Sequence, residues 1–140
     1  MAQRLIIGIS GASGVIYGIR MLEALAQDKA IETHLVMSPA AKATIAQETD
    51  WKVSDVENLA SVVHKPGDVG ASIASGSFDT MGMIIAPCSI KSLSAIANSY
   101  DADLLTRAAD VQLKEGRKVI LLLRETPLHI GHLRLMTQAA

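Results

Sequence analysis

One stretch near the N-terminus constrains the fold of this 140-residue chain more than any other. An aliphatic run over residues 4–10 passes into Gly11-Ala12-Ser13, and an amphipathic segment over residues 14–26 follows at once. That order predicts a buried strand, a tight turn and a helix. The turn places backbone N–H groups and two hydroxyls at the positive end of a helix, where an anion is stabilised. We therefore predict a phosphate-bearing ligand here; the alternative is a structural turn that needs small residues only for packing.

The rest of the chain repeats this alternation of strand and helix. Further strands are predicted over residues 31–37, 62–64, 81–86 and 118–123, and helices over residues 38–49, 54–60, 89–98, 103–116 and 131–140. Strands that alternate with helices predict right-handed crossovers and a mostly parallel sheet. The composition agrees, because 49% of the residues are hydrophobic and only 3% are aromatic, as expected for an aliphatic sheet covered by helices. The length suits one domain.

Charge and cysteine content exclude several classes of function. Thirteen basic and fourteen acidic residues give a formal charge of −1, so a nucleic-acid partner is not expected. No apolar run has the length of a membrane span, and the N-terminus lacks a signal-peptide pattern, so we expect a cytoplasmic protein without a membrane partner. The single cysteine, Cys88, excludes an intramolecular disulfide, and no spacing of histidines, cysteines and carboxylates predicts a metal site.

Polar residues follow the predicted strands where each strand ends. In parallel sheets, ligands bind beyond the carboxyl ends of the strands, and here those ends carry residues 10–13, Ser38, residues 87–92 and residues 124–125. Ser38 precedes a proline and therefore starts a helix as its N-cap. A helix start would lower the pKa of the Cys88 thiol, but a lone cysteine at a strand end is predicted to be a packing residue.

Five charged residues are candidates for chemistry. Lys91 lies in the first turn of a helix, where the dipole disfavours a cation, so it serves either a ligand or the solvent. Arg107 and Lys114 are seven residues apart on one helix, and with Arg124 they form either a basic cluster for a phosphate or a solvated face. Glu125 directly follows a strand predicted to be buried, so we expect a partly apolar environment for a carboxyl that acts as acid or base.

Several motifs together resemble one known family, the UbiX/Pad flavoproteins, over essentially the whole chain. These motifs occur in the family in the same order: residues 7–14, Ser38 with residues 40–41 and 48–49, and residues 75–78, 86–92, 103–111 and 124–129. The run Asp-Leu-Leu-Thr-Arg-Ala-Ala-Asp at residues 103–110 and the motif at residues 124–129 are the most specific. The resemblance implies a Rossmann-like (flavodoxin-like) three-layer sandwich that forms a single FMN-binding domain over residues 1–140.

The resemblance also implies an activity, flavin prenyltransfer. The family joins a dimethylallyl group from dimethylallyl phosphate to N5 and C6 of reduced FMN without a metal, and the prenylated FMN serves a UbiD-type decarboxylase. Its members form homo-oligomers, often a dodecamer built from trimers. Residues carried over as FMN contacts are Gly11, Ala12, Ser13, Ser38, Ser89, Ile90, Lys91, Ser92 and Arg124. Those carried over as catalytic are Ser13, Glu48 and Glu125, and those on the prenyl phosphate are Arg107, Lys114 and Arg124.

Two other functions stay open at this point. One is an FMN-dependent decarboxylase from the related cysteine-decarboxylase group, although that group uses a histidine base and an asparagine motif where this chain has Pro87 to Ser92. The other is a non-catalytic FMN-binding subunit. It draws support from the length of the chain, because the family continues through another strand and helix that carry further phosphate contacts. We therefore expect a chain truncated at its C-terminus relative to the family.

Overall fold

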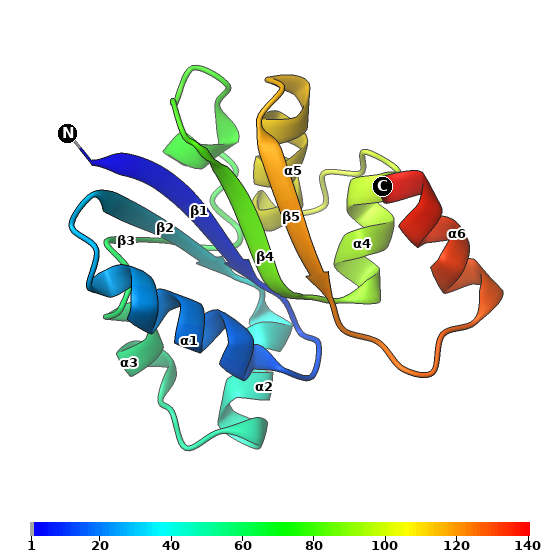
Figure 1. Ribbon diagram of the computed structural model, residues 1–140, viewed down its shortest axis with the longest axis horizontal. Coiled ribbons are helices and arrows are strands. Elements are labelled where there is room, and N and C mark those ends of the chain that lie inside the picture. The colour runs from blue at the N-terminus through cyan, green and yellow to red at the C-terminus, as the bar shows by residue number, and fades with distance from the viewer. Residues whose placement is uncertain (1) are drawn as a thin grey trace.

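The computed structural model describes residues 2–140, in which a five-stranded sheet lies between two layers of helices (Figure 1). The strands are β1 (Gln3–Ile9), β2 (Ile31–Met37), β3 (Val62–His64), β4 (Gly82–Cys88) and β5 (Lys118–Leu123). The helices are α1 (Val15–Ala26), α2 (Pro39–Glu48), α3 (Val53–Glu57), α4 (Ile90–Ala97), α5 (Leu104–Lys114) and α6 (Ile130–Ala139), with a 3₁₀ turn η1 (Ser72–Ala74). None of the helices within these residues is long and apolar enough to cross a membrane.

The strand order is β3-β2-β1-β4-β5, and every neighbouring pair is parallel. The chain builds outward from β1 to β3, then returns past β1 to add β4 and β5 on the other side. The order therefore reverses between β1 and β4, which is the point where doubly wound α/β sheets form a ligand crevice. The predicted α/β class with a parallel sheet is confirmed.

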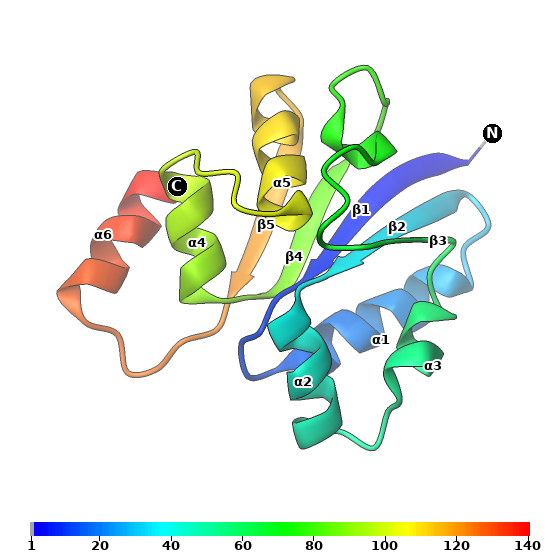
Figure 2. The same ribbon diagram turned by 180° about the vertical axis from the view of Figure 1, so that it is seen from behind.

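Aliphatic side chains fill the space on both faces of the sheet. The helices α1, α2 and α3 cover one face, over a core that includes Ile7 and Leu35. The helices α4, α5 and α6 lie on the other face with η1, over a core that includes Ile6, Val36 and Ile85 (Figure 2). Successive strand residues point to opposite faces, so a strand covered on both sides is apolar throughout.

The strand β5 departs from the prediction, because it is an edge strand and not a fully buried one. Its residues alternate between half-buried and exposed, and Ile120 and Leu122 are 49% and 39% exposed. Leu121 and Leu123 point the other way and pack against the core under α4. An aliphatic run has the same sequence at an edge as in the centre of a sheet, so composition alone did not reveal this position.

A histidine pair links β2 to β3 on the face covered by α5. His34 Nδ1 lies 2.9 Å from His64 Nε2, and His34 Nε2 lies 2.7 Å from Glu32 Oε1. Burial of His64, followed by the proximity of His34, lowers the pKa of the His64 imidazole, and Asp68 opposes this shift. The folded protein therefore holds His64 neutral at pH values where an unfolded chain would protonate it.

We expect this pair to make the protein less stable in mild acid. An unfolded histidine takes up its proton near pH 6.5, so the unfolded state binds more protons than the folded state as the pH falls below about 6.5. The free energy of unfolding should therefore decrease over that range, and His64→Gln should reduce the slope. Urea unfolding of the wild type and of His64→Gln between about pH 7.5 and 5 measures this pH dependence of the free energy of unfolding. Equal slopes in the two proteins would contradict the assignment to His64.

Candidate functional site

Backbone hydrogen bonds join the polar turns that follow β2, β1, β4 and β5 into one row, which we call the carboxyl edge. Each turn is tied to the strand or turn beside it, in the order of the sheet. The bonds run from the N–H of Ser38 to Ile9 O (3.0 Å), from that of Ser10 to Pro87 O (3.2 Å) and from that of Arg124 to Cys88 O (3.1 Å). The sheet therefore assembles the four predicted turns along a single edge, on both sides of the β1–β4 reversal.

A cavity of about 370 Å³ opens at this edge between α2, α4 and the start of α5. Five of the nine predicted FMN contacts line it, namely Gly11, Ser38, Ser89, Lys91 and Ser92. None of the remaining lining residues was predicted as a contact; they are Pro39, Ala40, Ala95, Ala102, Asp103 and Thr106. Asp103 and Thr106 are the two that carry polar side chains. Those two residues form the capping box of α5. Their sequence indicates the start of a helix, but only the packing of α5 shows that this helix start lies against the cavity.

Two of the lining serines are helix caps. The Ser38 hydroxyl accepts the N–H of Ala41 (3.1 Å) at the start of α2, and the Ser89 hydroxyl accepts that of Ser92 (3.2 Å) at the start of α4. The predicted cap at Ser38 is confirmed. Both helices direct their positive ends toward the carboxyl edge, which favours an anionic group there.

A second group of side chains surrounds the start of α1. The N–H of Gly14 donates to Glu48 Oε1 over 3.0 Å. The Ser13 hydroxyl, which has the largest effect, lowers the pKa of the Glu48 carboxyl by hydrogen bonding, with further contributions from the Gly14 N–H and the Arg124 charge. The structure thus brings together Ser13, Glu48 and Arg124, which lie far apart in the sequence, and keeps Glu48 ionised.

Gly14 is the N-cap of α1, and its φ of 102° lies in the left-handed region that favours glycine. Glycine has no side chain to accept an N–H of the helix. The Glu48 carboxylate accepts the Gly14 N–H. The anion at this helix start is therefore part of the chain, and the Ser13 hydroxyl is directed to Glu48.

Arg124 lies against α1, whereas Glu125 faces solvent. The Arg124 guanidinium carbon is 5.6 Å from the centroid of the Tyr17 ring, close enough for a cation–π interaction. Tyr17 was not predicted, because an aromatic residue in the first turn of a helix carries no signal of a distant partner. The Glu125 carboxylate is exposed and accepts the N–H of Thr126 (3.2 Å), so the expected apolar environment is absent.

The other two predicted cations each form ion pairs with carboxylates. Arg107 pairs with Asp101 (3.2 Å) and Asp110 (3.7 Å) on one side of α5. Lys114 pairs with Glu115 (3.0 Å) just before the amino end of β5, whereas Arg124 follows the carboxyl end of that strand. Within one chain, the length of β5 therefore separates Lys114 from Arg124, and Arg107 is held in ion pairs with two aspartates.

Three apolar residues near the carboxyl edge, Cys88, Ile90 and Ala12, face the protein interior. Burial raises the pKa of the Cys88 thiol to about 12, so the expected lowering is wrong and the prediction of a packing residue is confirmed. Ile90 also packs against the core, and Ala12 is buried in the turn after β1. These two residues offer a ligand mainly their backbone groups.

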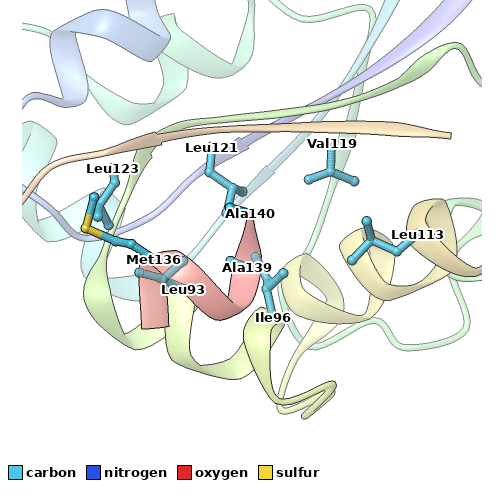
Figure 3. Close-up of a pocket in the computed structure, with 9 residues that line it drawn as sticks. All are labelled: Leu93, Ile96, Leu113, Val119, Leu121, Leu123, Met136, Ala139 and Ala140. Carbon is cyan, nitrogen blue, oxygen red and sulfur yellow. The ribbon is translucent and has the colours of Figure 1, made fainter. Parts of the chain in front are cut away.

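A second cavity, of about 290 Å³, lies between β5 and the helices α4, α5 and α6 (Figure 3). Figure 3 shows Val119, Leu121 and Leu123 pointing from β5 toward this space, opposite Met136 of α6. Its lining side chains are all aliphatic or methionine, so it offers no acid, base or cation. The carboxyl edge is consequently the better candidate for a site of chemistry.

Comparison with known proteins shows which family this chain belongs to. The Flavoprotein family pattern matches residues 1–136. A flavin prenyltransferase UbiX from Thauera aromatica is 68% identical over 137 residues, which make up 98% of this chain and 70% of that protein. The chain belongs to the UbiX flavin prenyltransferase family.

Two solved structures of UbiX relatives share the fold closely. A dodecameric FMN-dependent UbiX-like decarboxylase from Escherichia coli O157:H7 superposes with a TM-score of 0.96 at 49% identity, over 97% of this chain and 74% of that one. AnUbiX (PadA1), in complex with FMN and dimethylallyl pyrophosphate, superposes with a TM-score of 0.95 at 47% identity, over 99% of this chain and 73% of that one. The predicted family and its Rossmann-like fold are confirmed.

Proposed function

We propose that this chain binds FMN at the carboxyl edge and transfers a dimethylallyl group from a phosphate ester to reduced FMN, forming prenylated FMN. The observation that carries the proposal is the convergence of Ser13, Glu48 and Arg124 next to the 370 Å³ cavity. Membership in the UbiX family and the complex of AnUbiX with FMN and dimethylallyl pyrophosphate support it.

The cavity residues have the chemistry that FMN requires. Hydroxyls of Ser38, Ser89 and Ser92 and the ammonium group of Lys91 suit a phosphate and the polar edge of a flavin, while Ala40 and Ala95 are apolar. Reduced FMN supplies the electron-rich ring atoms, N5 and C6, that accept the prenyl carbons. We propose that Gly11, Ala12, Ile90 and Arg124 complete the contacts around these side chains.

The transfer creates negative charge on the leaving phosphate and moves protons. Arg124 suits the charge, and Glu48 with Ser13 suits the protons. The C–O bond of the prenyl ester breaks and phosphate leaves with the electron pair, so the Arg124 cation stabilises the developing negative charge. Bond formation at N5 and C6 releases two protons; one is taken up by the prenyl double bond and the other leaves with phosphate. The ionised Glu48 carboxylate accepts a proton, the Ser13 hydroxyl orients that carboxylate, and the exposed Glu125 serves as a second acid or base.

Further parts of the proposal concern assembly and the fate of the product. Because Arg107 and Lys114 are paired with carboxylates of their own chain, we propose that they contact the prenyl phosphate from a neighbouring copy in a homododecamer. The dodecameric UbiX-like structure supports such an assembly. We propose that the protein works in the cytoplasm and that its prenylated FMN is passed to a UbiD-type decarboxylase.

Mass spectrometry of the flavin tests the proposal. The 140-residue chain, incubated anaerobically with reduced FMN and either dimethylallyl phosphate or the pyrophosphate, should yield a flavin that is heavier by one C₅H₈ unit. The two donors show which ester the site accepts. Unchanged flavin together with carbon dioxide released from an aromatic acid would favour the decarboxylase instead. Bound but unchanged flavin with neither product would favour a non-catalytic FMN-binding subunit.

A further inference from the structure

A buried serine outside the predicted contacts connects the two strands that flank the FMN cavity. Ser10, at the end of β1, is only 1% exposed. Its hydroxyl accepts the N–H of Ser89 (2.8 Å) and donates to Pro87 O (2.9 Å). We propose that Ser10 is a positioning residue for FMN binding, which holds the first turn of α4 in place against the cavity. The inference rests on the proposed function for its ligand.

The need for this hydroxyl follows from the proline in β4. Ladder pairing between β1 and β4 ends at Gly8 and Ile85. Pro87 has no N–H to extend the pairing, so only its carbonyl remains available to β1. Ser10 uses both its backbone N–H (3.2 Å) and its hydroxyl to bond that carbonyl. The Ser10 side chain thus reinforces the one backbone bond that Pro87 still makes to β1 and extends the connection to Ser89.

The same hydroxyl controls the position of the α4 cap. Because Ser10 accepts the Ser89 N–H, it fixes the residue whose own hydroxyl caps α4 by accepting the N–H of Ser92. Ser89 also lies within hydrogen-bond distance of the Ser92 hydroxyl (3.2 Å). Ser89 and Ser92 line the cavity whereas Ser10 does not, so Ser10 acts on a ligand through them.

Ser10→Ala should weaken FMN binding by about tenfold, because it leaves the Ser89 N–H without its acceptor and frees the α4 cap to shift. Ser10→Cys should fall between Ala and the wild type, since a thiol is a weak donor and acceptor of similar size. The KM for the prenyl donor should change less than the KM for FMN, because Ser10 is linked to the α4 turn and not to Glu48 or Arg124.

Thr33→Val provides a matched control. Thr33 is also buried (2% exposed), and its hydroxyl likewise accepts a backbone N–H, that of Ser61 (3.0 Å). It lies in the first half of β2, away from the carboxyl edge. Its replacement should lower the melting temperature about as much as Ser10→Ala but leave FMN affinity unchanged.

Two measurements decide the inference. Flavin fluorescence titration gives the FMN Kd of each variant, and amide hydrogen exchange of the ligand-free proteins reports residues 89–92 directly. We expect Ser10→Ala alone to raise the Kd and to speed exchange at Ser89. An unchanged Kd in Ser10→Ala, or an equal rise in Thr33→Val, would overturn the proposal. If the wild-type chain does not bind FMN, the proposed function fails, and unchanged exchange at Ser89 would still overturn the positioning role.

Discussion

Glu48→Gln is expected to lower the rate of flavin prenylation by roughly two to four orders of magnitude, the usual contribution of a general acid or base. Glutamine has nearly the same shape, and its amide oxygen is able to accept the Gly14 N–H that Glu48 Oε1 accepts over 3.0 Å. The start of α1 should therefore remain intact. What disappears is the negative charge that the Ser13 hydrogen bond stabilises, together with the ability to accept a proton.

Single-turnover measurements of prenylated FMN, with the FMN Kd measured in parallel, test this expectation. The rate should fall strongly while the Kd changes little, because Glu48 is not among the residues that line the 370 Å³ cavity. Glu23→Gln is the control. Glu23 pairs with Arg20 over 2.7 Å on the surface of α1, where an ion pair contributes little. A Glu48→Gln rate within a few-fold of the control would exclude an acid or base role.

Gly18→Ala is expected to destabilise the protein by about 2 kcal/mol, although alanine is the better helix former by up to about 1 kcal/mol. Gly18 faces the sheet from the first turn of α1. A Cβ at this position would overlap the Ala86 carbonyl oxygen and lie 2.9 Å from Ile9 Cδ1. The strand carbonyl is fixed in the sheet, so the helix itself must move away. Packing therefore outweighs helix propensity.

Thermal unfolding measures this difference, with Gly67→Ala as the matched control. A Cβ at Gly67 would meet no atom within 4 Å, so that exchange should change stability by no more than about 0.5 kcal/mol. Gly18→Ala should also slow prenyl transfer, because a displaced α1 carries Ser13 and Gly14 away from Glu48. A Gly18→Ala protein as stable as the wild type would show that α1 does not depend on this close approach to β4.

Local sequence patterns were enough to predict most elements of the fold. The aliphatic runs of β1, β2 and β4 and the serine and proline at residues 38–39 each carry their signal within a few residues. Once strands and helices alternate, chain geometry leaves a parallel sheet as the main solution, and its carboxyl edge collects the polar turns. The predicted location of the site at that edge follows from the same rule.

Partners across the fold were beyond the reach of such patterns. The hydrogen bond from the Gly14 N–H to Glu48 joins positions more than thirty residues apart. The hydrogen bond from the Ser89 N–H to the Ser10 hydroxyl spans 79 positions. Neither residue type indicates its partner, because serine and glutamate are common at helix ends and on surfaces. The same limit applies to the Cys88 thiol. The helix start that follows it in the sequence favours a lower pKa, whereas the burial that raises the pKa depends on the packing of α4 and α5 over β4.

The opening strand, turn and helix illustrate this division. Their residue types alone predicted a buried strand that ends at a ligand-binding turn. The spacing of hydrophobic residues and the position of glycines determine local backbone structure within a few residues. Only the packed structure shows that Gly14 caps α1, that the Glu48 carboxylate occupies its positive end, and that Arg124 lies beside Tyr17. Those contacts depend on how α1, α2 and β5 are placed around the sheet, and that placement results from the packing of the whole chain.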